Sequence, residues 1–119
     1  MIIEDEEFLS SLLKSRLEKE GYKVVQAFDG EEALALMKSN SPSLILLDII
    51  MPKLSGFGVL EAISMDPELN GKAPIVILSN LAQESDIEKA QRLGASEFFV
   101  KVRVSIDDLI KKVNGILTN

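Results

Sequence analysis

The chain has 119 residues, 46% of them hydrophobic, and a net charge of −6 at pH 7. This length and composition predict one folded domain over residues 1–119, and the acidity disfavours a direct nucleic-acid partner. The sequence has no cysteine and no histidine, which excludes disulfides, thiolate or histidine metal sites and Ser-His-Asp catalysis within this chain. Because no apolar run approaches the ~20 residues of a membrane span, we expect a cytoplasmic protein with no membrane partner.

The first part of the chain alternates short apolar segments with helical patterns. An apolar start at residues 1–3 is followed by apolar residues at helical spacing, and Gly21 is predicted to end this helix at the C′ position. Residues 22–27 are predicted to form a strand. Asp29, with Glu32 three residues later, resembles a capping box that opens the second helix.

The rest of the chain continues this alternation. A continuous apolar run at residues 44–47 ends in Asp48 and predicts a strand buried on both faces. Pro52 and Gly56 after it are typical of a fixed loop, and a third helix is predicted to follow them. Further strands are predicted at 74–78 and 97–100, a fourth helix closed by Gly94, and a last helix capped by Ser105.

Five successive strand–helix units predict an α/β fold. Short right-handed crossovers of this kind build a (βα)5 doubly wound, five-stranded parallel sheet. The expected strand order is 2-1-3-4-5, the flavodoxin-like arrangement, in which ligands bind beyond the carboxyl ends of the strands near the first and third strands.

Polar side chains follow four of the five predicted strands: Glu4 and Asp5, then Asp48, Ser79 and Lys101. The topology brings these strand ends to one edge of the sheet. Three neighbouring carboxylates repel one another unless a cation intervenes, and ligation by oxygens with retained waters is what Mg²⁺ prefers. We therefore predict that Asp5 and Asp48, with a backbone carbonyl, hold Mg²⁺ or Mn²⁺, and that Glu4 acts through a bound water.

An aspartate in such a site can be a nucleophile toward phosphoryl groups. The metal would neutralise charge in the transition state, Ser79 could donate a hydrogen bond to one phosphoryl oxygen, and Lys101 could pair with another. The set therefore predicts a phospho-aspartate pocket centred on Asp48.

Each of these side chains also has a simpler explanation. Glu4 and Asp5 would stabilise the N-terminus of a following helix. Ser79 could only cap the next helix, Lys101 could be a solvated surface residue, and Phe98 could be a core residue. The functional interpretation depends on the joint occurrence of these residues at separate strand ends.

The chain resembles a receiver domain of the two-component response regulators, from Ile2 to the last predicted helix. The resemblance rests on four segments, namely the acidic pair Glu4-Asp5, the segment Asp48-x-x-Met51-Pro52-x-x-x-Gly56, Ser79 after an apolar strand, and Gly94-Ala95 followed by Phe98-Phe99-Val100-Lys101.

The resemblance implies a role for each residue. Asp48 is the phosphoacceptor, and Asp5, Asp48 and the backbone carbonyl of Ile50 bind Mg²⁺. The remaining implied roles are Ser79 as the switch hydroxyl, Phe98 as the rotating aromatic and Lys101 as the phosphate-pairing lysine.

The resemblance also implies the partners. The donor would be a phosphohistidine of a sensor histidine kinase or of a histidine phosphotransfer protein, docking chiefly near the first helix. Phosphorylation would change the face built from the fourth helix, fifth strand and fifth helix, which an unknown downstream protein would bind. We expect a stand-alone receiver without an output domain, not a substrate-turnover enzyme, that is a monomer or a phosphorylation-dependent dimer.

Several features depart from the receiver pattern. The first strand is very short, Asn80 stands where a smaller residue is usual and could narrow access to the phosphoryl group, and Phe98 lacks a hydroxyl. Val102 stands where proline, often cis, is usual, and we expect a trans peptide there because a cis bond before valine costs about 2.5–4 kcal/mol.

Two alternatives remain open. The first is a receiver-like binding module that is inactive in phosphorylation. The second is an aspartate-nucleophile phosphohydrolase of the haloacid dehalogenase type, although Ile50 stands where that family has a second aspartate.

Overall fold

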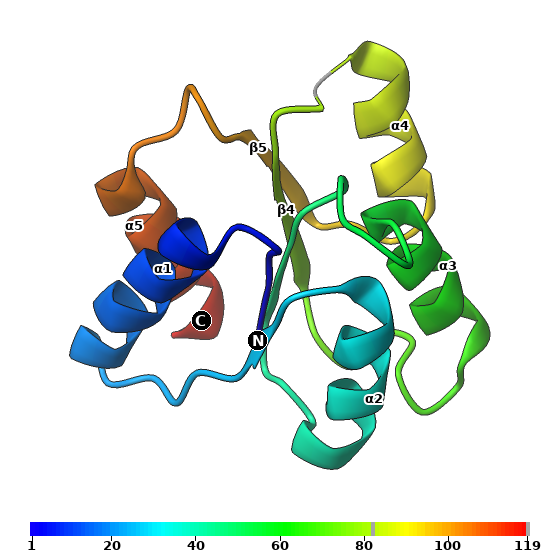
Figure 1. Cartoon of the computed structure of the whole chain (residues 1–119), viewed down its shortest axis with the longest axis horizontal. Helices are drawn as coiled ribbons and strands as arrows, with labels where there is room; N and C mark the ends of the chain where they lie inside the picture. The colour runs from blue at the N-terminus through cyan, green and yellow to red at the C-terminus, as the bar shows by residue number, and fades with distance from the viewer. Residues whose placement is uncertain (82, 119) are drawn as a thin grey trace.

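A computed structural model describes residues 1–81 and 83–118 and confirms the predicted α/β fold (Figure 1). Five strands alternate with five helices along the chain. The strands are β1 (Ile2–Ile3), β2 (Gln26–Ala27), β3 (Ile45–Leu47), β4 (Ile75–Ser79) and β5 (Glu97–Val100). The helices are α1 (Glu7–Lys19), α2 (Gly30–Asn40), α3 (Gly56–Met65), α4 (Glu84–Arg92) and α5 (Ile106–Leu117).

The strands form one parallel sheet in the predicted order β2-β1-β3-β4-β5. Helices cover both faces of the sheet: α1 and α5 lie on one side, and α2, α3 and α4 lie on the other (Figure 1). Alternation along each strand sends side chains into two separate cores. Ile2 belongs to the α1/α5 core, whereas Ile3 belongs to the core on the α2/α3/α4 side.

Helix ends follow the predicted capping residues with one difference. Gly21 has a φ of 94°, and its N–H donates to the carbonyl of Glu18, which closes α1 as a glycine at C′ does. Asp29 caps α2 by accepting from the N–H of Glu32. The capping-box expectation is half right, because the Glu32 carboxylate accepts from the N–H of Phe28 rather than from that of Asp29.

The second strand is shorter than predicted. Only Gln26 and Ala27 pair with β1, whereas a strand was expected from residue 22. The reason is non-local: β1 has two paired residues, so beyond the Val25 carbonyl, which accepts from the N–H of Ile2, the backbone of residues 22–25 has no strand beside it. Residues 22–25 therefore leave one side of their backbone without a strand partner.

The carboxyl ends of β1, β3, β4 and β5 share one edge of the sheet, as the parallel topology requires. Among the described residues, no helix is long and apolar enough to cross a membrane. The candidate site lies at the carboxyl edge of the sheet.

Candidate functional site

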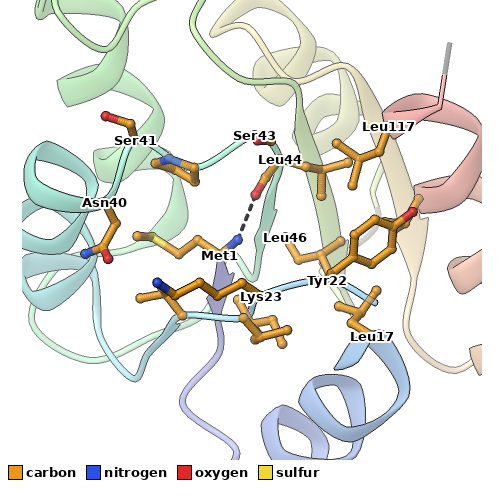
Figure 2. A pocket seen from close by; sticks show the side chains of 15 residues that line it. Met1, Leu17, Tyr22, Lys23, Asn40, Ser41, Ser43, Leu44, Leu46 and Leu117 are labelled. Carbon is orange, nitrogen blue, oxygen red and sulfur yellow. Dashed lines mark hydrogen bonds between the residues drawn. The ribbon is translucent and has the colours of Figure 1, made fainter. Parts of the chain in front are cut away.

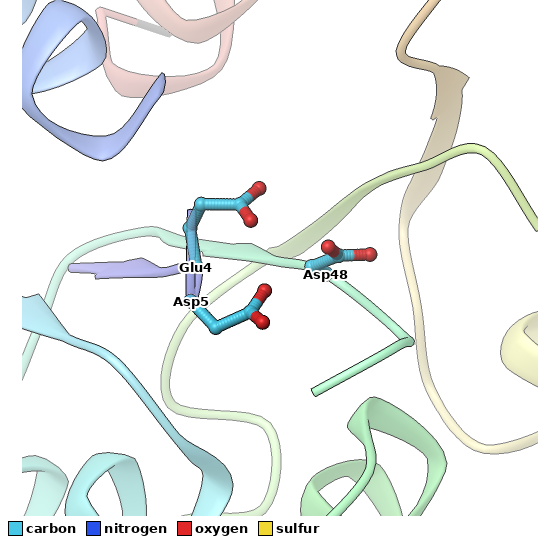
Figure 3. A group of neighbouring side chains, drawn as sticks. All are labelled: Glu4, Asp5 and Asp48. Carbon is cyan, nitrogen blue, oxygen red and sulfur yellow. The ribbon is translucent and has the colours of Figure 1, made fainter. Parts of the chain in front are cut away.

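Three carboxylates meet at the carboxyl edge of the sheet (Figure 3). Glu4 and Asp5 follow β1, and Asp48 follows β3, which pairs directly with β1. One oxygen from each of the three lies within 4.8 Å of the others. Glu4 and Asp48 are only 2% and 5% exposed, whereas Asp5 is exposed at the mouth of the site.

Lys101 joins two of these carboxylates. Its Nζ lies 2.7 Å from Glu4 Oε1 and 2.8 Å from Asp48 Oδ2, and its side chain is 15% exposed. The other Asp48 oxygen, Oδ1, accepts from the N–H of Ile50 at 3.3 Å. The Asp48 carboxylate is thus held in one orientation by a cation on one oxygen and by its own loop on the other.

Burial and charge shift the protonation of this cluster. Desolvation raises the pKa of Glu4 to about 7, against the opposing effect of its hydrogen bond from Lys101. Burial alone would lower the pKa of Lys101, but its hydrogen bonds to Asp48 and Glu4 outweigh burial and raise it. Lys101 therefore remains a cation at neutral pH.

The donor set fits a hard divalent cation. Two of the three carboxylates, those of Glu4 and Asp48, contact the Lys101 ammonium, and the carboxylate of Glu6 lies 4.0 Å from the same Nζ. The pocket therefore carries more negative than positive charge when its acids are ionised. All the side-chain donors are oxygens, which Mg²⁺ and Mn²⁺ bind in preference to softer ligands.

The remaining predicted residues surround this cluster. Ser79 ends β4 and is fully buried, and its hydroxyl oxygen accepts from the N–H of Leu81 at 3.2 Å. Its backbone carbonyl accepts from the N–H of Lys101, which ties the ends of β4 and β5 together. Phe98 is half-buried and packs against the core on the α2/α3/α4 side.

Comparison with known proteins identifies the family. Residues 1–114 match the response regulator receiver domain. The chain belongs to this family. Receiver domains are signalling domains rather than enzymes that turn over a substrate.

Individual relatives agree with this assignment. The receiver is 41% identical over 101 residues to "Probable transcriptional regulator ycf27" of Guillardia theta, covering 85% of this chain and 38% of that protein. It is 32% identical to "Protein PilH" of Pseudomonas aeruginosa, covering 98% of this chain and 95% of that one. A two-component response regulator structure from Clostridium difficile superposes with a TM-score of 0.90 at 27% identity, covering 99% and 93% of the two chains.

The relatives differ in length from this receiver. The chain spans between 38% and 50% of the ycf27 relatives. Their activity as whole proteins is therefore not carried over to this chain.

The two departures from the receiver pattern contact each other. The side-chain oxygen of Asn80 accepts from the N–H of Val102 at 3.1 Å, and the peptide before Val102 is trans, as predicted. Proline at position 102 would have no N–H to donate. Asn80 thus connects the loop after β4 to the loop after β5. That it narrows access to the phosphoryl group stays a prediction.

The contacts of Glu6 were not predicted, and Gly56, predicted as a loop residue, has a closer packing than the sequence indicated. Glu6 donates its backbone N–H to Glu4 Oε2 at 3.1 Å and adds a carboxylate near Lys101. Gly56 packs so tightly that an added Cβ would lie 2.3 Å from the carbonyl oxygen of Asp48. The acidic run around Glu6 was visible in the sequence, and a glycine at position 56 indicated a loop, but the sequence does not show which backbone Gly56 approaches.

Proposed function

We propose that the chain is a phosphorelay receiver whose Asp48 accepts a phosphoryl group from a phosphohistidine of a sensor histidine kinase or a histidine phosphotransfer protein. The observation that carries this proposal is the arrangement of Lys101, bonded to both Asp48 and Glu4, beside the exposed carboxylate of Asp5. A buried, oriented carboxylate next to a fixed cation is suited to accept a group rich in negative charge.

In the proposed reaction, an oxygen of Asp48 attacks phosphorus in line with the donor. The new O–P bond forms as the P–N bond to the donor histidine breaks, and that electron pair stays on the histidine nitrogen. Lys101 then pairs with a phosphoryl oxygen, while the Ser79 hydroxyl donates to another. Backbone contacts from Ile50 and Gly56 keep the loop beyond β3 in place.

Mg²⁺ or Mn²⁺ would be held by Asp5, Asp48 and the backbone carbonyl of Ile50, with Glu4 acting through a water. When bound, the ion supplies positive charge that offsets repulsion between the carboxylates and the incoming phosphoryl oxygens.

The proposed output is a two-state switch. Movement of Ser79 toward the phosphoryl group would shift the loop before α4, and Phe98 would turn into the space that this shift opens. The face made by α4, β5 and α5 would then bind a downstream protein. The stand-alone organisation over residues 1–119, the cytoplasmic location and the monomer or phosphorylation-dependent dimer stay predictions.

Acetyl phosphate tests the central step, because its phosphoryl group can be transferred without a kinase. With Mg²⁺ present, we expect a mass increase of one phosphoryl group on the chain and none on Asp48→Asn. Asp108→Asn, which removes an exposed carboxylate in the first turn of α5, is the matched control and should still be labelled. Labelling of Asp48→Asn to the same extent would exclude Asp48 as the acceptor.

One observation favours a second candidate, the phosphorylation-inactive binding module. Lys101 occupies an oxygen of Glu4 and an oxygen of Asp48 together, and Asn80 bonds to the loop that follows Lys101. If these contacts of Lys101 and Asn80 never break, Asp48 cannot be phosphorylated, and phosphorylation cannot change the partner-binding face. Unchanged amide NMR shifts at residues 48–50 during titration with Mg²⁺ would favour this candidate.

A further inference from the structure

Ser79 and Lys101, the two side chains proposed to contact phosphoryl oxygens, stand at the ends of neighbouring strands. β4 and β5 pair as far as Ser79 and Val100, and the N–H of Lys101 then donates to the Ser79 carbonyl at 3.1 Å. Beyond this backbone bond, among residues 1–81 and 83–118, a single hydrogen bond joins the loops that follow the two strands. In it the N–H of Val102 donates to the side-chain oxygen of Asn80 at 3.1 Å. We call this contact the loop bond.

The loop after β5 leaves the Val102 N–H to an outside acceptor. Arg103 and Val104 both donate their N–H groups to the carbonyl of Val100, which closes a turn around Lys101 and Val102. Such a turn uses the carbonyl of its first residue and the N–H of its fourth, and not the N–H of its third. The Val102 side chain is 79% exposed, so residue 102 contributes through its N–H rather than through packing.

The loop bond opposes the movement that the proposed switch requires. The Ser79 hydroxyl oxygen accepts from the N–H of Leu81 at 3.2 Å, and Asn80 stands between these two residues. β4 lies between β3 and β5 in the sheet. Movement of Ser79 toward Asp48, at the end of β3, is therefore movement away from the loop after β5. It carries Asn80 along the chain with it and pulls the Asn80 side chain away from Val102.

The two loops that the bond joins are held with unequal strength. Lys101 has its own anchors, because its Nζ lies 2.7 Å from Glu4 Oε1 and 2.8 Å from Asp48 Oδ2. The loop after β4 leads into α4, whose one buried residue is Ala90, whereas each of the other four helices buries three or four residues. Loss of the loop bond should therefore free the loop after β4 and leave Lys101 in place.

We propose that Asn80 is a positioning residue whose bond to the Val102 N–H restrains Ser79 in its unphosphorylated position and must break before the Ser79 hydroxyl reaches a phosphoryl group. This inference rests on the proposed function, because it takes Asp48 as the phosphoacceptor. One neutral hydrogen bond shifts an equilibrium by about two- to tenfold. The loop bond should lower the population of the arrangement ready for phosphorylation by that factor, and the rate of phosphorylation with it.

Two substitutions at position 80 separate this restraint from the predicted narrowing of access. Asn80→Leu keeps the size and branching of the side chain but removes the acceptor oxygen, whereas Asn80→Ala removes both. We expect the initial rate of labelling by acetyl phosphate with Mg²⁺ to rise about two- to tenfold in both variants. Asn70→Leu, which replaces an exposed asparagine in the loop after α3, is the matched control and should be labelled at the rate of the unaltered chain.

The donor side of the loop bond provides an independent test. Proline at position 102 is an unsuitable variant, because it is disfavoured at the third residue of the commonest turn type and would disturb Lys101. Replacement of Val102 by the α-hydroxy acid with the same side chain exchanges the N–H for an ester oxygen. This ester form should be labelled as fast as Asn80→Leu. The combination of both changes should be labelled no faster than either, because both remove the same bond.

A purely structural role of Asn80 predicts a different result. Each variant loses a hydrogen bond and some stability, which by itself would leave labelling unchanged or slow it. Hydrogen exchange without a phosphoryl donor measures the restraint directly. The Leu81 amide should exchange faster in Asn80→Leu and in the ester form of Val102. The Lys101 amide, which is bonded to the Ser79 carbonyl, should exchange at its original rate.

The outcomes distinguish this inference from the proposed function. Equal labelling rates, or slower labelling of Asn80→Leu and the ester form, would overturn the inference and leave the proposed function standing. Faster labelling of Asn80→Ala alone would also overturn it and would assign the effect to access. Absence of labelling in the unaltered chain and in every variant would overturn the proposed function and this inference together.

Discussion

The two edges of the sheet differ in how their polar groups are paired. At the carboxyl edge, strands end in charged side chains, and Lys101 satisfies the two buried carboxylates, Glu4 and Asp48. At the amino edge (Figure 2), β1 has two paired residues, and within residues 1–81 and 83–118 the N–H groups of Val25 and Leu44 and the carbonyls of Lys23 and Pro42 have no protein partner. Polar groups that need a partner thus occur at both edges, but among the residues that the structure describes only the carboxyl edge pairs them with a charged side chain.

The stability of the receiver should therefore depend more on the carboxyl edge than on the amino edge. The carboxyl edge depends on a few strong and mutually dependent contacts, so that removal of one member leaves others uncompensated. The backbone groups without protein partners at the amino edge involve no buried carboxylate, so changes there should cost less.

Lys101→Met should have the largest effect. It leaves Glu4 and Asp48 buried without their cation, and loss of one member of a buried ion pair typically costs about 3 kcal/mol or more. Urea unfolding should show this loss, and added Mg²⁺ should restore part of it by binding the native state. Lys112→Met is the matched control: it breaks the exposed 2.8 Å pair with Glu97 and should cost less than about 1 kcal/mol. Equal losses would contradict the contrast between the edges.

Gly56→Ala should come next. The new Cβ would lie 2.3 Å from the carbonyl oxygen of Asp48 and 2.6 Å from the Cα of Ile49, so the backbone must shift. Overpacking of this kind costs about 1–3 kcal/mol. Gly115→Ala in α5 meets nothing within 4 Å and should instead stabilise by about 0.5–1 kcal/mol through helix propensity. Thermal unfolding of the two variants measures the difference, and a shift of the same sign in both would argue against close packing at Gly56.

Glu4 should make stability depend on pH. Its pKa is raised from 4.5 to about 7 in the folded chain, so the folded state holds a proton that the unfolded state has released. Its contribution is fully present below pH 4.5 and is lost as the pH rises through about 7. Urea midpoints without divalent cations should therefore fall across this range, and Glu4→Gln should flatten the fall. A slope unchanged by Glu4→Gln would assign it to another group.

Much of this architecture follows from local patterns in the sequence. The apolar runs before Asp48 and Ser79 predict buried parallel strands, and parallel topology then requires Glu4, Asp5, Asp48 and Lys101 to meet. Contacts that depend on distant segments could not be read in the same way. The pairing of residues 22–25 depends on the length of β1.

The same limit applies within the site itself. The two ion pairs of Lys101, with Glu4 and with Asp48, depend on side-chain rotamers that the spacing of residues in the sequence does not define. In the sequence, Asn80 and Val102 are separate departures from the receiver pattern. In the structure they form one hydrogen bond, in which Val102 provides the N–H and Asn80 the acceptor oxygen.

Asn80→Ala should have the smallest effect. The Val102 N–H loses its acceptor, but both residues are exposed and water can replace the side-chain oxygen, so we expect a loss of about 0.5–1 kcal/mol. The informative measurement is hydrogen exchange, which should accelerate at Val102. Asn70→Ala, an exposed asparagine in the loop after α3, is the control for a surface substitution. If Val102 exchanges equally in both variants, the two loops are held by the backbone bond from Lys101 to Ser79 alone, and Asn80 has no positioning role.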